Sequence, residues 1–78
     1  MKMEIDRRKT ADNIYVLSEK NGMSGNALAN KLELSSVAVW KWMNAATLPS
    51  LENIVAMCGI FECEITDIVA FRKNEESA

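Results

Sequence analysis

Helix start and stop signals recur at short intervals along this chain, and they restrict its fold more than any other feature. Serine precedes three of the apolar segments, at Ser24, at Ser35 or Ser36, and at Ser50. Serine is a preferred N-cap because its hydroxyl accepts a hydrogen bond from a free amide of the first helical turn. Asn-Gly at 21–22 and a proline-containing segment at 44–49 supply helix ends. These signals predict a series of short helices with short connections.

Apolar spacing within the intervals predicts an all-α, compact five-helix domain. The helices are expected at about 6–20, 25–32, 36–44, 51–61 and from about 64, with a core spanning about 6–71 of one domain, 1–78, and a frayed polar tail, 72–78. The residues predicted to face inward are Ala11, Ile14, Leu17, Leu28, Ala29, Leu32, Val39, Trp42, Met43, Leu51, Ile54, Val55, Cys58, Ile65, Ile68 and Val69.

The segment VAVWKW, residues 37–42, alternates like a half-buried strand. A strand there would be the only one in the chain, and its backbone groups would lack partners. As a helix, the same segment places Val39 and Trp42 on one inward side. Because two residues along a helix are separated by about 200°, Trp40 then points away from Trp42. We predict a helix with Trp42 in the core and Trp40 exposed, either to DNA or to a protein partner.

Several functional classes lack the residues they need. Histidine is absent, and Cys58 and Cys63 alone cannot complete a tetrahedral zinc site, so both are predicted to be reduced core thiols. There is no glycine-rich phosphate loop or activated serine, so we expect no enzyme, cofactor or small-molecule substrate. The apolar runs are shorter than the roughly 18 residues that span a bilayer, and the N-terminal residues are charged. We therefore expect a cytoplasmic protein without a membrane role.

The charge is distributed unevenly along the chain. The net charge is −2, although a nucleic-acid-binding domain is usually basic. Residues 1–41 hold seven basic and five acidic side chains, a net charge of +2, and the remainder has a net charge of −4. The first half is therefore the half expected to face phosphates.

The second and third predicted helices have the features of a helix-turn-helix. Ala29 is the small residue needed where the helices cross, and Val39 and Trp42 are the apolar residues that hold the second helix in place. Residues 13–69 resemble the lambda-repressor-like helix-turn-helix family of the Cro and XRE type. The matching segments are NGMS, LANKL, S..V..WMN, LPSLENIVAMCGIF and EITDIV. The resemblance implies a DNA-binding regulator, a phage- or bacterial-type repressor, that acts as a homodimer on a two-fold double-stranded operator.

A recognition helix at about 36–44 would place its N-terminal, outward side chains against base edges in the major groove. The predicted base contacts are Ser36, Val37, Trp40 and Lys41. The predicted phosphate contacts are Ser24, Asn26, Lys31, Asn44 and Thr47. The basic segment 7–9 is either an arm that contacts DNA or the solvated first turn of the first helix.

Four positions depart from the family pattern. Gly25 replaces the usual glutamine at the start of the second helix, Glu33 replaces the usual glycine of the turn, and Ala45 and Ala46 replace phosphate-contacting residues. These departures support an alternative, a protein-interaction module on the same fold, antirepressor-like or a toxin partner. For dimerisation, we expect contacts from the fifth helix and tail, with Ile68 and Phe71.

Overall fold

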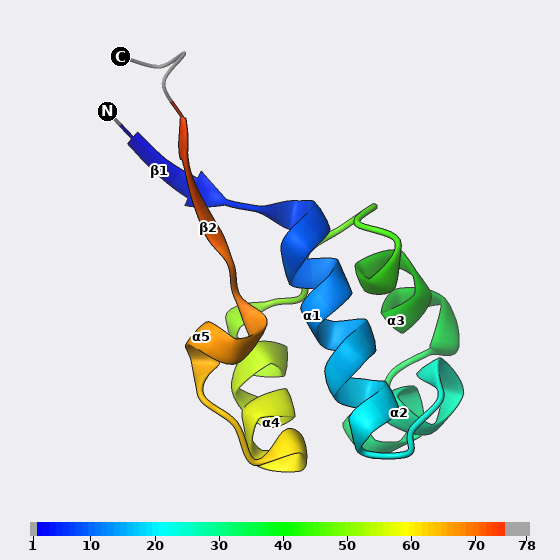
Figure 1. Cartoon of the computed structure of the whole chain (residues 1–78). Helices are drawn as coiled ribbons and strands as arrows, with labels where there is room; N and C mark the ends of the chain where they lie inside the picture. The colour runs from blue at the N-terminus through cyan, green and yellow to red at the C-terminus, as the bar shows by residue number, and fades with distance from the viewer. Residues whose placement is uncertain (1, 75–78) are drawn as a thin grey trace.

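The computed structural model describes residues 2–74, which form five helices and two short strands. Figure 1 shows α1 beside two groups of helices, α2 with α3 on one side and α4 with α5 on the other. The elements in chain order are β1 (Lys2–Ile5), α1 (Arg7–Lys20), α2 (Gly25–Leu32), α3 (Ser36–Met43), α4 (Leu51–Phe61), α5 (Ile65–Ile68) and β2 (Phe71–Asn74). The helices occur in the predicted order, but the strands mean that the fold is mostly rather than entirely helical.

Serine side chains cap the three central helices as predicted. The distances from amide nitrogen to serine Oγ are 3.1 Å for Ala27 to Ser24, 3.2 Å for Ala38 to Ser35 and 3.2 Å for Asn53 to Ser50. Of the two candidates for α3, Ser35 is therefore the cap and Ser36 is the first helical residue. VAVWKW lies within α3, which confirms that this segment is a helix.

The core lies between α1 and the other four helices. Its largest fully buried apolar side chains are Ile14, Leu28, Val39, Met57 and Ile68. The prediction that Leu51 and Val55 of α4 face inward was wrong, because their side chains are 68% and 58% exposed. Ile54, Met57 and Phe61 form the buried stripe instead. Apolar residues occur all around this helix, so their spacing did not select one side. Ile65 was also predicted inward and is exposed.

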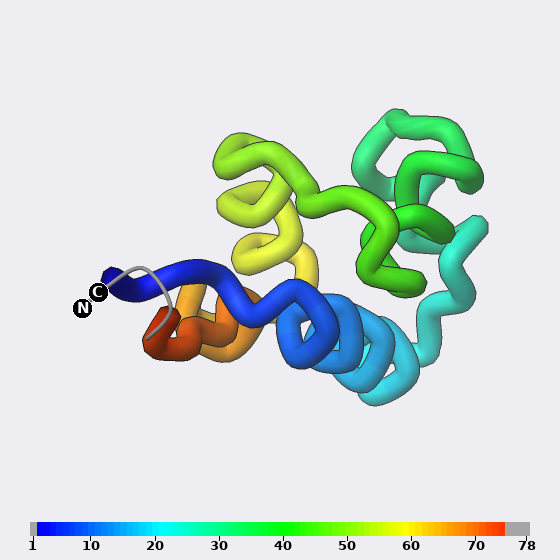
Figure 2. The backbone as a smooth tube through the Cα atoms, turned by 90° about the horizontal axis from the view of Figure 1, so that it is seen from above, coloured from blue at the N-terminus to red at the C-terminus, as the bar shows by residue number. Residues whose placement is uncertain are grey.

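The two strands pair antiparallel, with Lys2 opposite Asn74 and Ile5 opposite Phe71. The prediction of a frayed tail was therefore wrong for residues 72–74, and residues 75–78 lie outside the described part of the chain. Each strand has four residues, too few for alternation to be recognised, and its partner lies at the other end of the sequence. Figure 2 shows the two strands and α5 at one end of the molecule, with α2 and α3 at the other.

Side chains of α1 end α5 and turn the chain into β2. The Asn13 side-chain amide donates to the Ile68 carbonyl at 3.0 Å, and the Thr10 hydroxyl accepts from the Ala70 amide at 3.0 Å. These bonds occupy backbone groups that a longer α5 would use within the helix. Because Val69 is already extended, α5 ends at Ile68 and Phe71 belongs to a strand.

Candidate nucleic-acid interface

Helices α2 and α3 form the predicted helix-turn-helix. Ala29 of α2 is buried together with Val39 of α3, which fits the close crossing that the small side chain allows. The turn between them contains Glu33 in the left-handed conformation, with φ 58° and ψ 41°. The Leu34 amide closes the turn by donating to the Ala29 carbonyl at 2.9 Å. The turn therefore has the backbone geometry that glycine usually supplies, at a strain of about 1 kcal/mol.

The helix α3 ends in the same kind of motif. The Ala46 amide donates to the Lys41 carbonyl at 2.9 Å, and the Ala45 amide donates to the Trp42 carbonyl at 3.1 Å. Ala45 has φ 58°, the position that glycine normally occupies in this Schellman motif. Ala45 therefore keeps the helix end that a glycine would form, although it offers no side chain to a phosphate.

The two tryptophans of α3 point in opposite directions. Trp42 is 6% exposed and lies in the core, whereas Trp40 is 60% exposed. This confirms the predicted assignment of one tryptophan to the core and one to the surface. Ser36, Val37 and Lys41 are exposed as well. The four side chains predicted to contact bases thus lie on the solvent side of α3.

The start of α2 adjoins the exposed side of α3. Asn26, Ser36, Val37 and Trp40 line one shallow hollow on the surface. This hollow brings one predicted phosphate contact together with three of the predicted base contacts. Ser24 immediately precedes α2, and its Oγ already accepts from the Ala27 amide. Its role in the structure is therefore that of a cap, and the amides of the first turn point out of the helix end.

The remaining predicted phosphate contacts are more scattered. Lys31 is exposed in the last turn of α2, at the opposite end of that helix from Asn26. The Asn44 side-chain amide donates to the Trp40 carbonyl at 2.8 Å, so it closes the end of α3. Thr47 is exposed in the loop after α3. Of the predicted phosphate contacts, Asn26 therefore lies beside the exposed side of α3, and the Asn44 side chain bonds to the backbone of α3.

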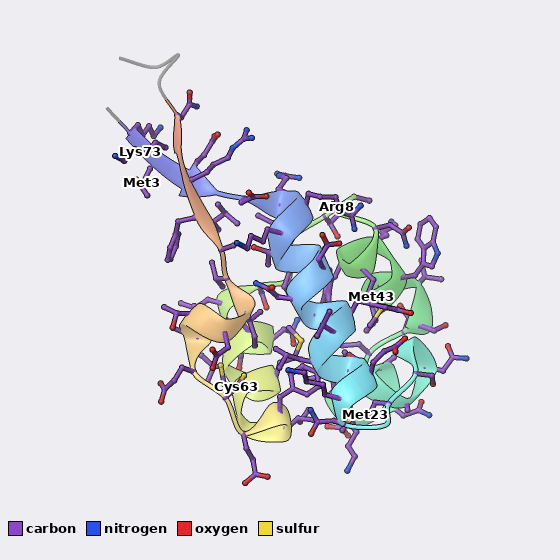
Figure 3. All side chains as sticks on the ribbon, viewed as in Figure 1. Met3, Arg8, Met23, Met43, Cys63 and Lys73 are labelled. Carbon is purple, nitrogen blue, oxygen red and sulfur yellow. The ribbon has the colours of Figure 1, made fainter. Side chains whose placement is uncertain are left out.

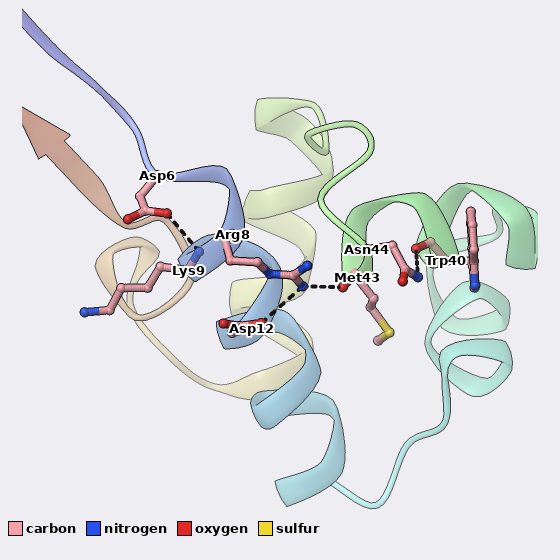
Figure 4. Close-up of polar contacts among 7 residues, drawn as sticks. All are labelled: Asp6, Arg8, Lys9, Asp12, Trp40, Met43 and Asn44. Atoms are coloured by element: carbon pink, nitrogen blue, oxygen red, sulfur yellow. Dashed lines mark hydrogen bonds and ion pairs between the residues drawn. The ribbon is translucent and has the colours of Figure 1, made fainter. Parts of the chain in front are cut away.

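Arg8 of α1 holds the C-terminal end of α3. Its Nη2 atom donates to the Met43 carbonyl at 3.0 Å and lies 3.2 Å from the Asp12 carboxylate (Figure 4). A cation at a helix C-terminus satisfies a free carbonyl and opposes the negative end of the helix dipole. Sequence analysis missed this contact because 35 residues separate Arg8 from Met43. Arg7 and Lys9 are exposed in the first turn of α1.

Gly25 leaves a second hollow beside the helix-turn-helix. Its lining includes Tyr15, Ser18, Met23 and Met43, and Figure 3 shows Met23 and Met43 near the ends of α1 and α3. The Ser18 hydroxyl is buried without a hydrogen-bond partner among residues 2–74. A Cβ atom on Gly25 would meet only ordinary contacts, at 3.8 Å to the Met43 sulfur. A Cβ atom therefore fits at this position, which lines the hollow.

The two cysteines pack against the core and are partly buried. Cys58 and Cys63 are free thiols, and burial, followed by the proximity of Cys58, raises the pKa of Cys63 to about 11. A protonated thiol is a poor nucleophile and metal ligand. In residues 2–74, no three acidic, cysteine or histidine side chains are grouped as metal ligands. Over the same range, no helix has the length and hydropathy to cross a bilayer.

Comparisons with known proteins agree with this geometry. The sequence model of the Cro/C1-type helix-turn-helix DNA-binding domain matches residues 13–74. The chain therefore belongs to the Cro/C1-type helix-turn-helix DNA-binding domain family, as its resemblance to that family predicted. A search of curated proteins found no match.

A solved structure shares the fold. It is a transcriptional regulator from Listeria innocua, 19% identical, with a TM-score of 0.73 over 95% of this chain. The match spans 64% of the Listeria chain. At that identity the likeness concerns the fold, and it includes nearly the whole of the present chain.

Proposed function

We propose that this chain is a sequence-specific, cytoplasmic DNA-binding regulator that places α3 in the major groove. The observation that carries the proposal is the outward face of α3, where Ser36, Val37, Trp40 and Lys41 are exposed while Val39 and Trp42 fix the helix from behind. One side of α3 is thus buried in the core, and the opposite side is exposed and can contact a partner. Double-stranded DNA is the partner that the family membership favours.

The side chains on this face read bases in two ways. Lys41 can donate to guanine O6 and N7, and Ser36 can donate or accept at either base pair. Val37 and Trp40 offer apolar contact, which suits the thymine methyl group. This face lacks the bidentate readers arginine and glutamine, so DNA shape contributes to the choice of sequence.

Phosphate binding is assigned to the start of α2. Asn26 and the first-turn amides lie beside the exposed side of α3, and the positive end of a helix dipole attracts anions. Lys31 and Thr47 would add contacts at the edge of the interface. Because these groups supply few positive charges, we expect moderate affinity and a modest salt dependence.

The proposed assembly is a homodimer that represses transcription from a two-fold operator. A chain of this size covers only one half-site, and two-fold symmetry doubles the readout. Ile68 is fully buried, so it contributes to the core, and the earlier assignment of this residue to a dimer contact was wrong. Phe71 is exposed and remains available for such a contact.

A selection from random duplexes at low and moderate salt tests the proposal. We expect an enriched motif with half-sites related by a two-fold axis, and affinity that falls as salt rises. No enrichment at either salt concentration would contradict the proposal. A replacement of Lys41 by Ala should relax one base position of the motif. Lys73→Ala, on β2 and distant from α3, is the matched control.

The second candidate is a protein-interaction module on the same fold. The exposed apolar pair Val37 and Trp40, the net charge of −2 and the absence of side-chain donors at Ala45 and Ala46 favour it. It predicts no positive strip beside α3 and no duplex selection. Binding of a protein that is lost on Trp40→Ala, with no DNA binding, would establish this candidate instead.

A further inference from the structure

An apolar groove lies at the end of the molecule away from α3. Ile5 of β1 and Phe71 of β2 line it together with Leu51 of α4 and Ile65 of α5, and its volume is about 300 Å³. All four of these side chains are exposed, and Met3 continues the same face of the two-stranded sheet outward. Contiguous apolar surface of this kind marks an interaction site.

Within residues 2–74, the sheet has two strands, so no other strand pairs with the outer side of β1. A two-stranded sheet is marginally stable alone, and this one projects beyond the helices (Figure 3). In an antiparallel pair, alternate residues bond across the ladder, and those between them turn their amides and carbonyls outward. The Asp6 amide donates to the Ala70 carbonyl at 2.8 Å, and the register continues this alternation along β1. Met3 and Ile5 therefore present their backbone groups to the outer edge of β1.

Charge distinguishes the two edges. On β1, Lys2 and Glu4 point to the polar face of the two-stranded sheet, and the Glu4 carboxylate lies 2.7 Å from Arg72 Nε. If two β1 strands pair antiparallel about Met3, each Lys2 lies opposite Glu4 of the other copy. Self-pairing along β2 would instead bring Arg72 and Lys73 of both copies together. Opposite charges across strands stabilise a pairing and like charges oppose it.

We propose that a second copy of this chain adds to the outer edge of β1, antiparallel and centred on Met3, to form one continuous four-stranded sheet from the two two-stranded sheets. Opposed residues of an antiparallel pair share a face of the sheet, so the two apolar faces unite and join the two apolar grooves. This contact rests on the proposed function, because it is the contact through which the proposed homodimer would form. The chemistry is a two-fold β-strand addition with apolar cover.

Proline substitution at the outward positions tests this contact. Proline at an outward edge position removes no hydrogen bond between β1 and β2, so Met3→Pro blocks pairing of a second copy at β1. Lys73→Pro is the same change on the edge of β2. We expect sedimentation equilibrium of the full chain, without DNA, to give a dimer. Met3→Pro should raise its dissociation constant about tenfold or more because two symmetric hydrogen bonds are lost, and Lys73→Pro should leave it nearly unchanged.

Charge reversal provides a second test that keeps the backbone intact. Lys2→Glu should weaken the dimer. Lys2→Glu with Glu4→Lys and Arg72→Glu should restore it, because the third change keeps an ion pair between positions 4 and 72. A monomeric wild-type chain, equal weakening by both proline variants, or no restoration by the triple variant would overturn the proposal. If Met3→Pro loses its helical circular dichroism signal, the variant is unfolded, and the charge-reversal variants then test the contact. A wild-type dimer that selects no DNA would contradict the proposed function while leaving this contact in place.

Discussion

The opposite environments of Trp40 and Trp42 give the sharpest prediction of this structure. Trp42→Ala removes a large side chain that is 6% exposed, and such truncations cost about 3–5 kcal/mol. A chain of 78 residues is expected to have a total stability of about 4–12 kcal/mol. Trp42→Ala should therefore remove about a quarter or more of the stability. Trp40 is 60% exposed, so Trp40→Ala should change the stability by about 0.5 kcal/mol or less.

Urea unfolding followed by far-ultraviolet circular dichroism measures both values. The two variants remove the same side chain from the same helix, so differences in helix propensity largely cancel between them. A loss of more than about 2 kcal/mol for Trp40→Ala would refute the assignment of the two faces. A loss of less than about 1 kcal/mol for Trp42→Ala would do the same.

Three further variants test the helix ends and the Arg8 contact. Glu33→Gly should raise the free energy of unfolding by up to about 1 kcal/mol because it relieves a left-handed residue, whereas Glu19→Gly within α1 should lower it; urea midpoints measure both. Gly25→Gln should fold normally, since its Cβ meets only ordinary contacts, and should strengthen binding to a selected duplex; weaker binding would contradict the role assigned to the start of α2. Arg8→Gln should lower stability by about 0.5 kcal/mol yet weaken duplex binding more than Arg7→Gln does, as fluorescence anisotropy can show.

The sequence predicts the helical part of this fold well because the information there is local. Each serine cap lies within a few residues of the amide it accepts from, as for Ser50 and Asn53. The side to which Trp42 points follows from helical spacing. Family resemblance then orders these helices, and the matched region, residues 13–74, contains most of them.

The features that the sequence does not predict depend on distant residues. The β1–β2 pairing joins opposite ends of the chain, and the four-residue strands have no recognisable pattern. The end of α5 is set by Asn13 and Thr10, more than fifty positions away. The buried side of α4 was missed because Leu51 and Val55 are as apolar as their buried neighbours. At the candidate interface, the contact of Arg8 with α3 was missed for the same reason of distance.

Binding of a selected duplex by Trp40→Ala and Val55→Ala tests the central claim most directly. Both residues are apolar and about equally exposed, at 60% and 58%, but Val55 lies on α4 rather than on α3. An interface anchor typically contributes more than about 1 kcal/mol to binding, so we predict that Trp40→Ala lowers the affinity for the duplex about tenfold. Val55→Ala should bind like the wild type. Equal affinity of all three proteins, or loss of binding with Val55→Ala alone, would contradict the assignment of α3 as the DNA-reading helix.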